Sequence, residues 1–341
     1  MTLALPSRRL ALSPRWTRDA LWRRARAVPS LDLRFADSKS LVDAISGQNL
    51  ITFTRASSGT YVGSDGLLKT AATNEPRFDH NPTTGECLGL LVEEQRTNLL
   101  LNSATLSTQS VIVTAAAHTL SFTGTGTITL SGTSTAGPLV GTGTGEANRV
   151  SLTFTPTAGT LTLTVSGTVS NAQLEVGAFR TSYIPTTTAA VTRNADVTDI
   201  INTAITNGIR TLYAEFRSPA SGTRGVVSLN DNTANGRAAI NTSGTDPRLV
   251  VVDGGVTQAD IDAGTIAANT SSRMAVRINT NDFSASFNGG AVVTDTSGTL
   301  PTVDRLFIGR SQAGEYLNAP IARLIGWREA LPDSVLQELT R

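Results

Sequence analysis

The amino-acid sequence predicts an all-β protein made of tandem antiparallel β-sandwiches, with a jelly roll at the C-terminus and a short helical arm at the N-terminus. Long stretches alternate aliphatic side chains with threonine or serine, which is the two-residue period of half-buried strands. The 30 glycines break these stretches into short pieces. Only 16% of the residues are charged and 5% are aromatic, which argues against charge-driven disorder. At 341 residues, the chain has room for two or three domains.

Residues 1–30 are predicted to form a basic anchor arm. The stretch 16–28 lacks glycine and proline, is rich in alanine, leucine and arginine, and lies between Pro14 and Pro29, so we expect a short helix there. A helix this short is marginal in water and needs a partner to be stable. Two interpretations stay open: a solvated or frayed tail, and a docking arm that orders on an assembly partner.

The arm concentrates positive charge. In residues 1–28, seven arginines stand against the single acid Asp19, which gives +6 there and leaves −5 for the rest of a chain whose formal charge is +1. Because lysine is nearly absent and the remainder is acidic, nucleic-acid binding is not expected, and an acidic groove on another subunit is the better partner. The predicted anchoring residues are Arg15, Trp16, Arg18, Trp22, Arg23, Arg24 and Arg26.

Residues 31–100 carry strand signals from their start. Segments 31–35 and 50–54 alternate apolar with polar side chains, as half-buried strands do. The Ser-Asp-Gly turn at 64–66 lies between two short apolar segments, 61–62 and 67–68. Since Asp-Gly supplies the positive backbone angles of tight hairpins, a β-hairpin is predicted here.

Residues 101–195 form a second compositional zone, rich in alternating threonine and aliphatic side chains. In residues 150–165, two alternating runs flank a turn at 156–159, which predicts an antiparallel hairpin. A hydroxyl-bearing face tolerates water while the aliphatic face is buried. The zone should therefore close as a two-sheet sandwich.

Residues 196–341 repeat this pattern with longer strands and predict a sandwich or jelly roll. A hairpin turn is expected at 288–290, and a terminal helix should follow Pro332, with Asp333 or Ser334 as its N-cap. The expected strands are residues 211–216, 225–229, 248–252, 273–278, 283–287, 304–308 and 321–327.

Several segments resemble proteins of tailed bacteriophages. Residues 50–102 resemble a segment that recurs in tail-fibre, head-spike and related virion proteins of tailed phages and phage-like particles. The matching runs are residues 53–57, 60–62, 66–68, 75–79 and 89–99. The runs 173–177, 181–186 and 191–193 resemble the closing strand of carbohydrate-binding-module-like sandwiches in the same proteins. The runs 306–309 and 321–331, with Gly314, are similar to a laminin-G or concanavalin-A-like jelly roll.

The resemblance implies a virion surface protein, often oligomeric, whose modules bind glycan or space other parts. It divides the chain into an arm (1–30), a phage virion module (31–100), a carbohydrate-binding-module-like sandwich (101–195) and a jelly roll (196–341). Residues 31–35 also resemble a first jelly-roll strand. A second arrangement therefore stays open, in which 31–100 completes the C-terminal sandwich and 101–195 is inserted.

The residue patterns do not favour an enzyme. The jelly-roll glucanases that the chain resembles carry two glutamates and an aspartate closely spaced on one strand, and no such run is present. Glu93 and Glu94 are adjacent, and neighbours on a strand point to opposite faces. A single cysteine, Cys87, and two histidines, His80 and His118, argue against a disulfide and a zinc site. No cofactor is expected, although Asp and Asn side chains in turns leave calcium open.

Glycan binding requires an aromatic platform and planar hydrogen-bonding side chains, gathered in loops at one end or face of a sandwich. The candidates are Asn230, Asp231, Asn232, Asn235, Arg237, Asp253, Tyr316 and Asn318. The competing interpretation is turn chemistry alone, because turns require Asn, Asp and Gly anyway. Trp327 is expected in the core or against the sheet rather than in a sugar site.

Together these features predict a non-enzymatic structural virion protein: a tail fibre, head spike, or neck or collar appendage at the particle surface. Its N-terminus would bind other virion subunits, and its distal sandwich would bind host cell-surface polysaccharide. A homo-oligomer is expected, because multivalency strengthens weak glycan contacts. The alternatives are an architectural spacer or decoration protein without ligand and, less favoured, a capsule depolymerase. No run of about 18 apolar residues predicts membrane insertion.

Overall fold

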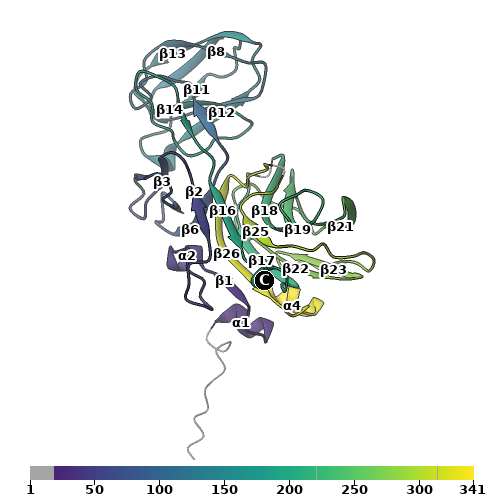
Figure 1. Ribbon diagram of the computed structural model, residues 1–341. Helices are drawn as coiled ribbons and strands as arrows, with labels where there is room; N and C mark the ends of the chain where they lie inside the picture. Colours follow the sequence, from purple (N-terminus) through teal and green to yellow (C-terminus); the bar gives the residue numbers. More distant parts are fainter. Residues whose placement is uncertain (1–18, 220, 313) are drawn as a thin grey trace, which may run out of the picture.

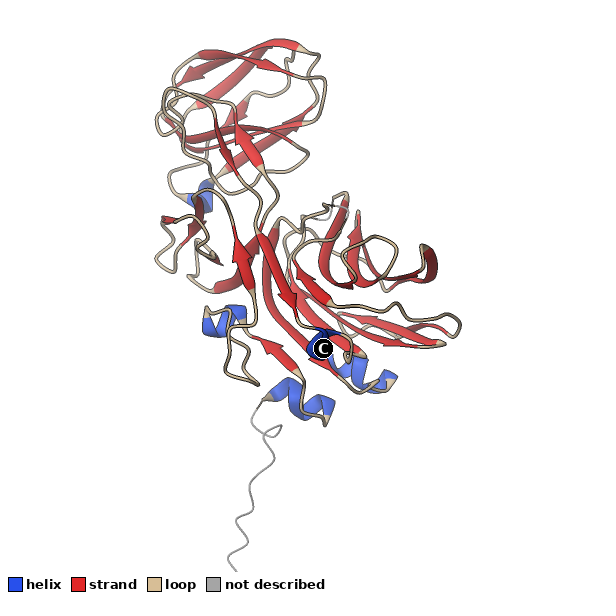
Figure 2. Cartoon of the chain, viewed as in Figure 1, coloured by secondary structure: helices blue, strands red, loops and turns tan. Residues whose placement is uncertain are grey.

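The computed structural model confirms the predicted all-β architecture (Figures 1 and 2). It describes residues 19–219, 221–312 and 314–341. Two large antiparallel sheets form the main body, and a smaller β-sandwich stands beside it, coloured teal in Figure 1. Among the described residues, no helix combines the length and the apolar character that crossing a membrane requires.

One sheet of the main body, called here the first sheet, combines strands from both ends of the chain. Its spatial order is β24 (Val293–Asp295), β23 (Asp282–Phe287), β22 (Ser272–Asn279), β17 (Thr211–Phe216), β26 (Ala319–Trp327), β6 (Cys87–Val92) and β5 (Phe78–His80). In addition, β1 (Leu31–Leu33) pairs with β26, with Leu33 opposite Leu324. Strands from residues 31–100 therefore pair directly with strands from residues 196–341.

The second sheet of the main body also draws on residues 31–100. Its order is β2 (Thr52–Thr54), β16 (Val197–Ile201), β25 (Arg305–Ile308), β18 (Thr223–Asn230), β19 (Arg237–Ser243), β20 (Asp246–Asp253) and β21 (Val256–Asp262). Aliphatic and aromatic side chains from both sheets fill one continuous core. Its fully buried members include Leu33, Phe35, Leu90, Leu212, Ile240, Phe283 and Ile308. The structure thus has the arrangement in which residues 101–195 are inserted into the main body.

The inserted sandwich has its own two sheets and its own core, which includes Leu120, Phe122, Leu161 and Leu174. One sheet contains β11 (Leu139–Val140), β10 (Thr127–Gly132), β13 (Gly159–Ser166) and β8 (Gln109–Val113). The other contains β12 (Val150–Phe154), β9 (His118–Gly124) and β14 (Val169–Val176). The chain enters and leaves the insert through the two-stranded ribbon of β7 (Arg96–Asn98) and β15 (Val191–Arg193).

The hairpin predicted for residues 150–165 is wrong, because its two strands belong to different sheets. β12 pairs with β9, whereas β13 pairs with β10 and β8. The connection crosses from one sheet to the other, and the backbone amide of Thr157 donates to the carbonyl of Thr133, 3.1 Å away. Two-residue alternation on both sides of a turn is the same for a hairpin and for such a crossing, since it records only which side of each strand is buried.

The predicted arm helix is shorter than expected and packs on the main body. Helix α1 (Ala20–Ala25) is capped by the Asp19 carboxylate and ends at Arg26, whose φ is 54°. The Trp22 indole donates to Asp32 Oδ2 at 3.0 Å. Arg24 donates to carbonyls of the C-terminal residues, including that of Arg341 at 2.9 Å. The partner that so short a helix needs is therefore provided, for residues 20–25, by the chain itself.

Of the predicted anchoring residues, Arg23 and Arg26 are exposed, whereas Trp22 is buried and Arg24 is half-buried. The remaining three, Arg15, Trp16 and Arg18, lie outside the described residues. Helix α1 covers the outer face of the first sheet beside α4 (Asp333–Leu339). The apolar cluster beneath the two helices contains Ala25, Tyr213, Ala275, Ile325, Trp327, Leu331, Leu336 and Leu339. Trp327 is thus a core residue, as predicted.

The predicted turns were confirmed, whereas the predicted N-cap of the C-terminal helix and the predicted end of the 31–35 strand were wrong. The hairpin of β3 (Gly59–Val62) and β4 (Leu68–Ala71) turns at Gly66, whose φ is +74°. The 288–290 turn joins β23 to β24. The C-terminal helix has Pro332 as its N-cap, and the Asp333 carboxylate instead accepts from Arg277 at 2.6 Å. Phe35 begins the short helix α2 (Phe35–Ser38) rather than ending a strand, and α3 is Thr203–Thr206.

Candidate functional site

The structure does not gather the predicted glycan-binding residues into one site. Asn230 is fully buried, and its amide donates to the carbonyl of Ser228 at 2.9 Å. Its side-chain oxygen accepts from the backbone of Asn232 at 2.8 Å, which fixes the turn. Asp231 likewise accepts from the amide of Thr233 at 2.8 Å. Turn chemistry therefore accounts for these polar side chains.

The other candidates lie at both ends of β18. Near its C-terminal end, Arg237 donates to the carbonyl of Ala234, and the Asn235 carbonyl accepts from the amide of Gly255 at 2.9 Å. On the neighbouring loop, Asp253 accepts from Thr299. Near the opposite end of β18, Tyr316 forms a bridge with Arg310. Asn318 lies on that side too, and its Oδ1 accepts from the amide of Glu94 at 2.9 Å.

Instead, the structure brings together charged residues where the inserted sandwich meets the main body. Arg77 lies between two carboxylates, at 2.7 Å from Glu93 Oε2 and 2.5 Å from Asp196 Oδ2. Arg55 contacts the other oxygen of Asp196 at 2.9 Å, and Arg193 lies 3.5 Å from Glu93. We call these five residues the junction ion cluster. All five side chains are almost completely buried.

The junction ion cluster joins both crossings between the insert and the main body. Glu93 precedes the insert and Asp196 follows it, and the backbone amide of Glu93 donates to Asp196 Oδ2 at 2.8 Å. From the insert itself, the amide and the hydroxyl of Ser182 donate to the Glu93 carboxylate, at 2.7 and 2.6 Å. Because buried charges are tolerated only when paired and hydrogen-bonded, this network favours one placement of the insert.

The electrostatics of the cluster keep Glu93 ionised. Burial by itself would raise the pKa of this carboxyl group, but the charges of Arg193 and Arg77 and the bonds from Ser182 lower it to about 2. Burial would likewise lower the pKa of Arg77, but Asp196 and Glu93 raise it. Glu93 and Arg77 are therefore both charged at neutral pH.

A second contact between the insert and the main body is aromatic. The Phe179 ring of the insert is flanked by two guanidinium groups, with the Cζ of Arg96 at 4.8 Å and that of Arg224 at 4.4 Å from the ring centroid. Arg224 belongs to β18 of the main body. Such cation–π contacts contribute about 0.5–1 kcal/mol each when exposed and more when desolvated.

Next to the ion cluster, a cleft of about 340 Å³ opens between the insert and the main body. We call it the junction cleft. Residues around β3 and β5 contribute Tyr61, Val62, Asp79, His80, Asn81 and Pro82. The insert contributes Glu146 and Arg149 from the short helix η2 (Glu146–Asn148) and its end, with Arg180, Thr181, Ser182 and Tyr183. The main body adds Arg217, Asn269, Asn318, Ala319 and Pro320.

The lining of the junction cleft includes buried polar atoms that have no partner in the described part of the chain. These atoms are His80 Nε2, Glu146 Oε1 and Arg149 Nε. Only 6% of His80 and 8% of Arg149 are exposed. A buried polar atom without a partner costs free energy. The half-exposed ring of Tyr61 lies in the same lining.

Asp79 gives the cleft an unusual carboxyl group. Burial raises the pKa of Asp79 to about 6, against the lowering effect of the bond from the Val62 amide. The nearby charge of Glu93 raises it further. The group is therefore partly protonated in mildly acidic solution.

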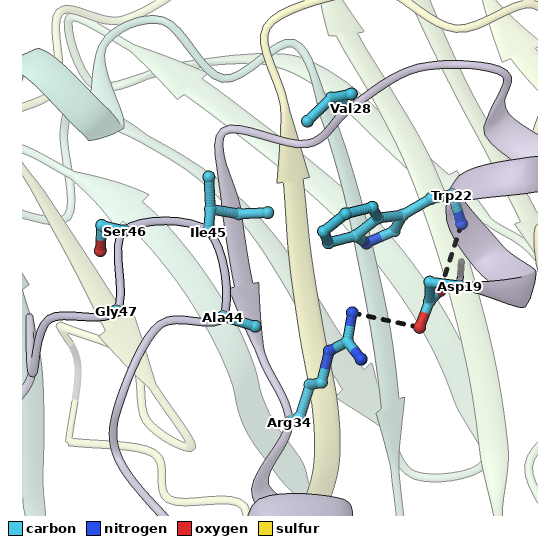
Figure 3. Close-up of a pocket in the computed structure, with 8 residues that line it drawn as sticks. All are labelled: Asp19, Trp22, Val28, Arg34, Ala44, Ile45, Ser46 and Gly47. Carbon is cyan, nitrogen blue, oxygen red and sulfur yellow. Dashed lines mark hydrogen bonds and ion pairs between the residues drawn. The ribbon is translucent and has the colours of Figure 1, made fainter. Parts of the chain in front are cut away.

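A larger cavity, of about 490 Å³, lies between α1 and the loop at residues 44–47 (Figure 3). Its lining mixes apolar and polar side chains, with the Trp22 ring and Ile45 facing one another across it. The polar groups there already bind each other: Arg34 contacts Asp19 at 3.1 Å, and Asp19 caps α1. This cavity therefore offers fewer free hydrogen-bonding groups than the junction cleft.

Sequence reasoning missed the junction cleft apart from Asn318. Its lining comes from several separated stretches of the sequence, and no local pattern marks Arg149 or Arg180 as neighbours of Tyr61. The available signal was the resemblance of residues 75–79 and 89–99 to phage proteins, because these runs contain Arg77 and Glu93. No group of three or more His, Cys, Asp or Glu side chains placed to hold a metal ion occurs within residues 19–219, 221–312 and 314–341.

Comparison with known proteins gives no family. No family model and no curated protein matches the chain. Similar solved structures include the CBM40 module of the Ruminococcus gnavus IT-sialidase bound to α2,3-sialyllactose, at 14% identity and a TM-score of 0.35, covering 40% of this chain and 85% of that one.

Two whole sialidases show similar values. The NanB sialidase from Streptococcus pneumoniae has 15% identity and a TM-score of 0.34, covering 42% of this chain and 26% of that one. The Trypanosoma rangeli sialidase in complex with the inhibitor DANA has 13% identity and a TM-score of 0.34, covering 42% and 25%. At these values the likeness assigns no ligand or activity to this chain.

Proposed function

We propose that this protein is a non-enzymatic structural component of a phage particle that binds a host-surface glycan in the junction cleft. The glycan part rests on one observation: the cleft combines a tyrosine ring, planar hydrogen-bonding side chains and buried polar atoms without partners. Sugars present hydroxyl groups that both donate and accept, and apolar ring faces that pack on aromatic side chains.

The junction ion cluster supports this function by holding the cleft in one shape. The cleft has walls from the insert and from the main body, so its width depends on how the two are joined. Ser182 lines the cleft and also binds Glu93 of the cluster. A preformed site loses less conformational entropy on binding than a mobile one. This benefit is large for sugars, because each hydrogen bond to a sugar replaces one to water.

The virion part of the proposal is supported by the resemblance of residues 50–102 to tail-fibre and head-spike proteins. In this proposal the protein lies on the particle surface and is attached through residues preceding Asp19 together with the exposed Arg23 and Arg26. Several copies on one particle would add their weak contacts to the host surface. Imaging of particles with a labelled chain would test the location.

The attachment experiment follows from how α1 is bound. Deleting residues 19–28 would remove the buried Trp22 and would take Ala25 out of the apolar cluster beneath α1 and α4, so it would disturb the fold itself. Deletion of residues 1–18 leaves that cluster intact. We expect this deletion to abolish incorporation into particles while the far-ultraviolet circular dichroism of the purified protein stays unchanged. An unchanged copy number per particle would refute attachment through this segment.

Glycan binding is tested with the full chain on an array of bacterial surface polysaccharides. Tyr61→Ala should lower binding about fivefold or more, because a base stacked on an aromatic side chain loses roughly 1–3 kcal/mol when that side chain is truncated to alanine, and we expect a stacked sugar ring to behave alike. Asn235→Ala changes an exposed loop residue that the sequence predicted to bind glycan, and it should leave binding unaltered. Loss of binding in Asn235→Ala but not in Tyr61→Ala would place the glycan site in the loop that contains Asn235. Absence of binding to every polysaccharide would favour an architectural spacer.

One observation favours a second candidate function, cleavage of the glycan. Asp79, with its raised pKa, and the ionised Glu93 line the same cleft, and carboxyl groups with separated pKa values are typical of acid and base roles. Against this, both oxygens of Glu93 are bound to Ser182, and one also to Arg77. Release of reducing ends from a bound polysaccharide, lost in Asp79→Asn, would establish a hydrolase.

A further inference from the structure

Two arginines in the junction cleft have no carboxylate partner. The Arg180 guanidinium donates to the backbone carbonyl of Arg149, and Arg217 Nη1 donates to the carbonyl of Asn269 at 2.5 Å. Neither side chain lies within ion-pair distance of an acid in the described part of the molecule. Nearby arginines differ in this respect, since Arg55, Arg77, Arg96 and Arg193 all contact carboxylates.

The insert side of the cleft places two cations close together. The Arg180 guanidinium donates to the backbone carbonyl of Arg149, and the nearest carboxylate, that of Glu146, is 3.8 Å from the Arg149 guanidinium. The Arg180 side chain reaches solvent, yet the protein around it lowers its pKa, and the charge of Arg149 lowers it further. Two guanidinium groups that repel one another are stabilised when an anion lies between or beside them.

The acids of the cleft do not cancel this charge. Glu93 is already neutralised by Arg77 and Arg193 within the junction ion cluster. The other charged residues of the lining are the cations Arg149, Arg180 and Arg217 and the acids Glu146 and Asp79. The cleft therefore has more positive than negative groups even when both acids are ionised.

We propose that the junction cleft selects acidic glycans, binding the carboxylate of a uronic or nonulosonic acid residue through Arg180 and Arg217. This inference rests on the proposed glycan-binding function and names the class of sugar. A guanidinium group presents two parallel N–H donors that match the two oxygens of a carboxylate. The cleft also offers a hydrogen-bonding group for the neighbouring hydroxyls, in the exposed side-chain amide of Asn269.

The test compares one set of polysaccharides in two chemical forms. Immobilised uronate-containing and sialic-acid-containing polysaccharides are presented beside the same polymers after reduction of their carboxyl groups to alcohols, and a sulfated polymer is included. Full-length wild-type protein, Arg180→Gln, Arg217→Gln and the control Arg328→Gln are measured by surface plasmon resonance. Arg328 is exposed on the main body, where it donates to the carbonyl of Ala204, and does not line the cleft.

We expect carboxyl reduction, Arg180→Gln and Arg217→Gln each to weaken binding at least about tenfold, and Arg328→Gln to leave it unchanged. Equal binding to the native and the reduced polymers would overturn the acidic preference while leaving glycan binding itself in place. Equal loss in all three variants would show general charge attraction and would also overturn it. A preference for the sulfated polymer would overturn the carboxylate as the recognised group in favour of sulfate. Absence of binding to every polymer would overturn the proposed glycan function as well.

Discussion

Removal of the Glu93 carboxylate by Glu93→Gln is the sharpest test of the junction ion cluster. The substitution keeps the size of the side chain and one oxygen, which still accepts from Ser182. It removes the charge that faces Arg77 at 2.7 Å and Arg193 at 3.5 Å. Arg193 then loses its ion-pair partner, and Arg77 keeps only Asp196, which it shares with Arg55.

The magnitude follows from the pKa of Glu93. The cluster lowers this pKa from 4.5 to about 2. Because one pH unit corresponds to about 1.4 kcal/mol, the folded protein favours the ionised carboxylate by roughly 3 kcal/mol. We expect Glu93→Gln to lower the free energy of unfolding by about that amount at pH 7. Loss of one partner of a buried ion pair typically costs about 3–5 kcal/mol, which agrees.

The sign of the pH dependence is a further requirement. A carboxyl group whose folded pKa is depressed contributes stability above its unfolded pKa, here 4.5, and that contribution is lost as the pH falls toward 2. The difference in unfolding free energy between wild type and variant should therefore be full at pH 7 and less than half as large near pH 3. Urea unfolding followed by tryptophan fluorescence at both pH values measures it.

Asp65→Asn is the matched control, since Asp65 forms an ion pair with Lys69 on the exposed hairpin at 2.5 Å. Exposed pairs contribute little, so this variant should unfold like the wild type. If Glu93→Gln changed the unfolding free energy by less than about 0.5 kcal/mol at pH 7, or by the same amount at pH 3, the cluster would not be held by charge.

Three further outcomes are expected. Trp22→Ala should lower the free energy of unfolding by about 3–5 kcal/mol, because it leaves a cavity beside Asp32; an unchanged urea midpoint would mean that α1 does not pack on the body. Gly89→Ala should prevent folding, because Gly89 has a φ of +117° and a Cβ there would lie 2.0 Å from the carbonyl oxygen of Ile321. Gly47→Ala, where a Cβ would meet open space, should cost only about 1 kcal/mol. Soluble yield and melting temperature distinguish the two variants. Asp79, whose folded pKa is raised to about 6, stabilises the fold below pH 4, and this contribution is lost as the pH rises through 6. In Asp79→Asn the melting temperature should therefore fall less between pH 4 and pH 6 than it does in the wild type. Equal falls in the two proteins would refute this.

Local sequence determined the elements that a few neighbouring residues specify. The Asp-Gly turn at 64–66 and the Asn-Gly-Gly turn at 288–290 form hairpins because the backbone needs positive φ there, and Gly66 and Gly289 supply it. The two-residue period of segments such as 211–216 and 321–327 likewise identified strands of the main body. Each of these features depends on contacts within one short stretch.

Tertiary structure decided which strands pair and where the polar groups meet. The period of residues 150–165 is the same in one sheet or across two, and only the packing of β12 and β13 on opposite sides of the core separates these cases. Tertiary structure also decided the role of Asn230. Its residue type suits an exposed loop, but its side chain is buried and hydrogen-bonded within a turn.

The candidate site depends on tertiary structure most of all. The junction cleft and the junction ion cluster assemble from segments that precede, form and follow the inserted sandwich, and Arg55 lies 141 positions from its partner Asp196. Alternation along a strand records burial but carries no information about partners so far away in sequence. The sequence therefore determined the strands and turns of this protein, whereas the folded chain alone determined its charged junction, because that junction consists entirely of long-range contacts.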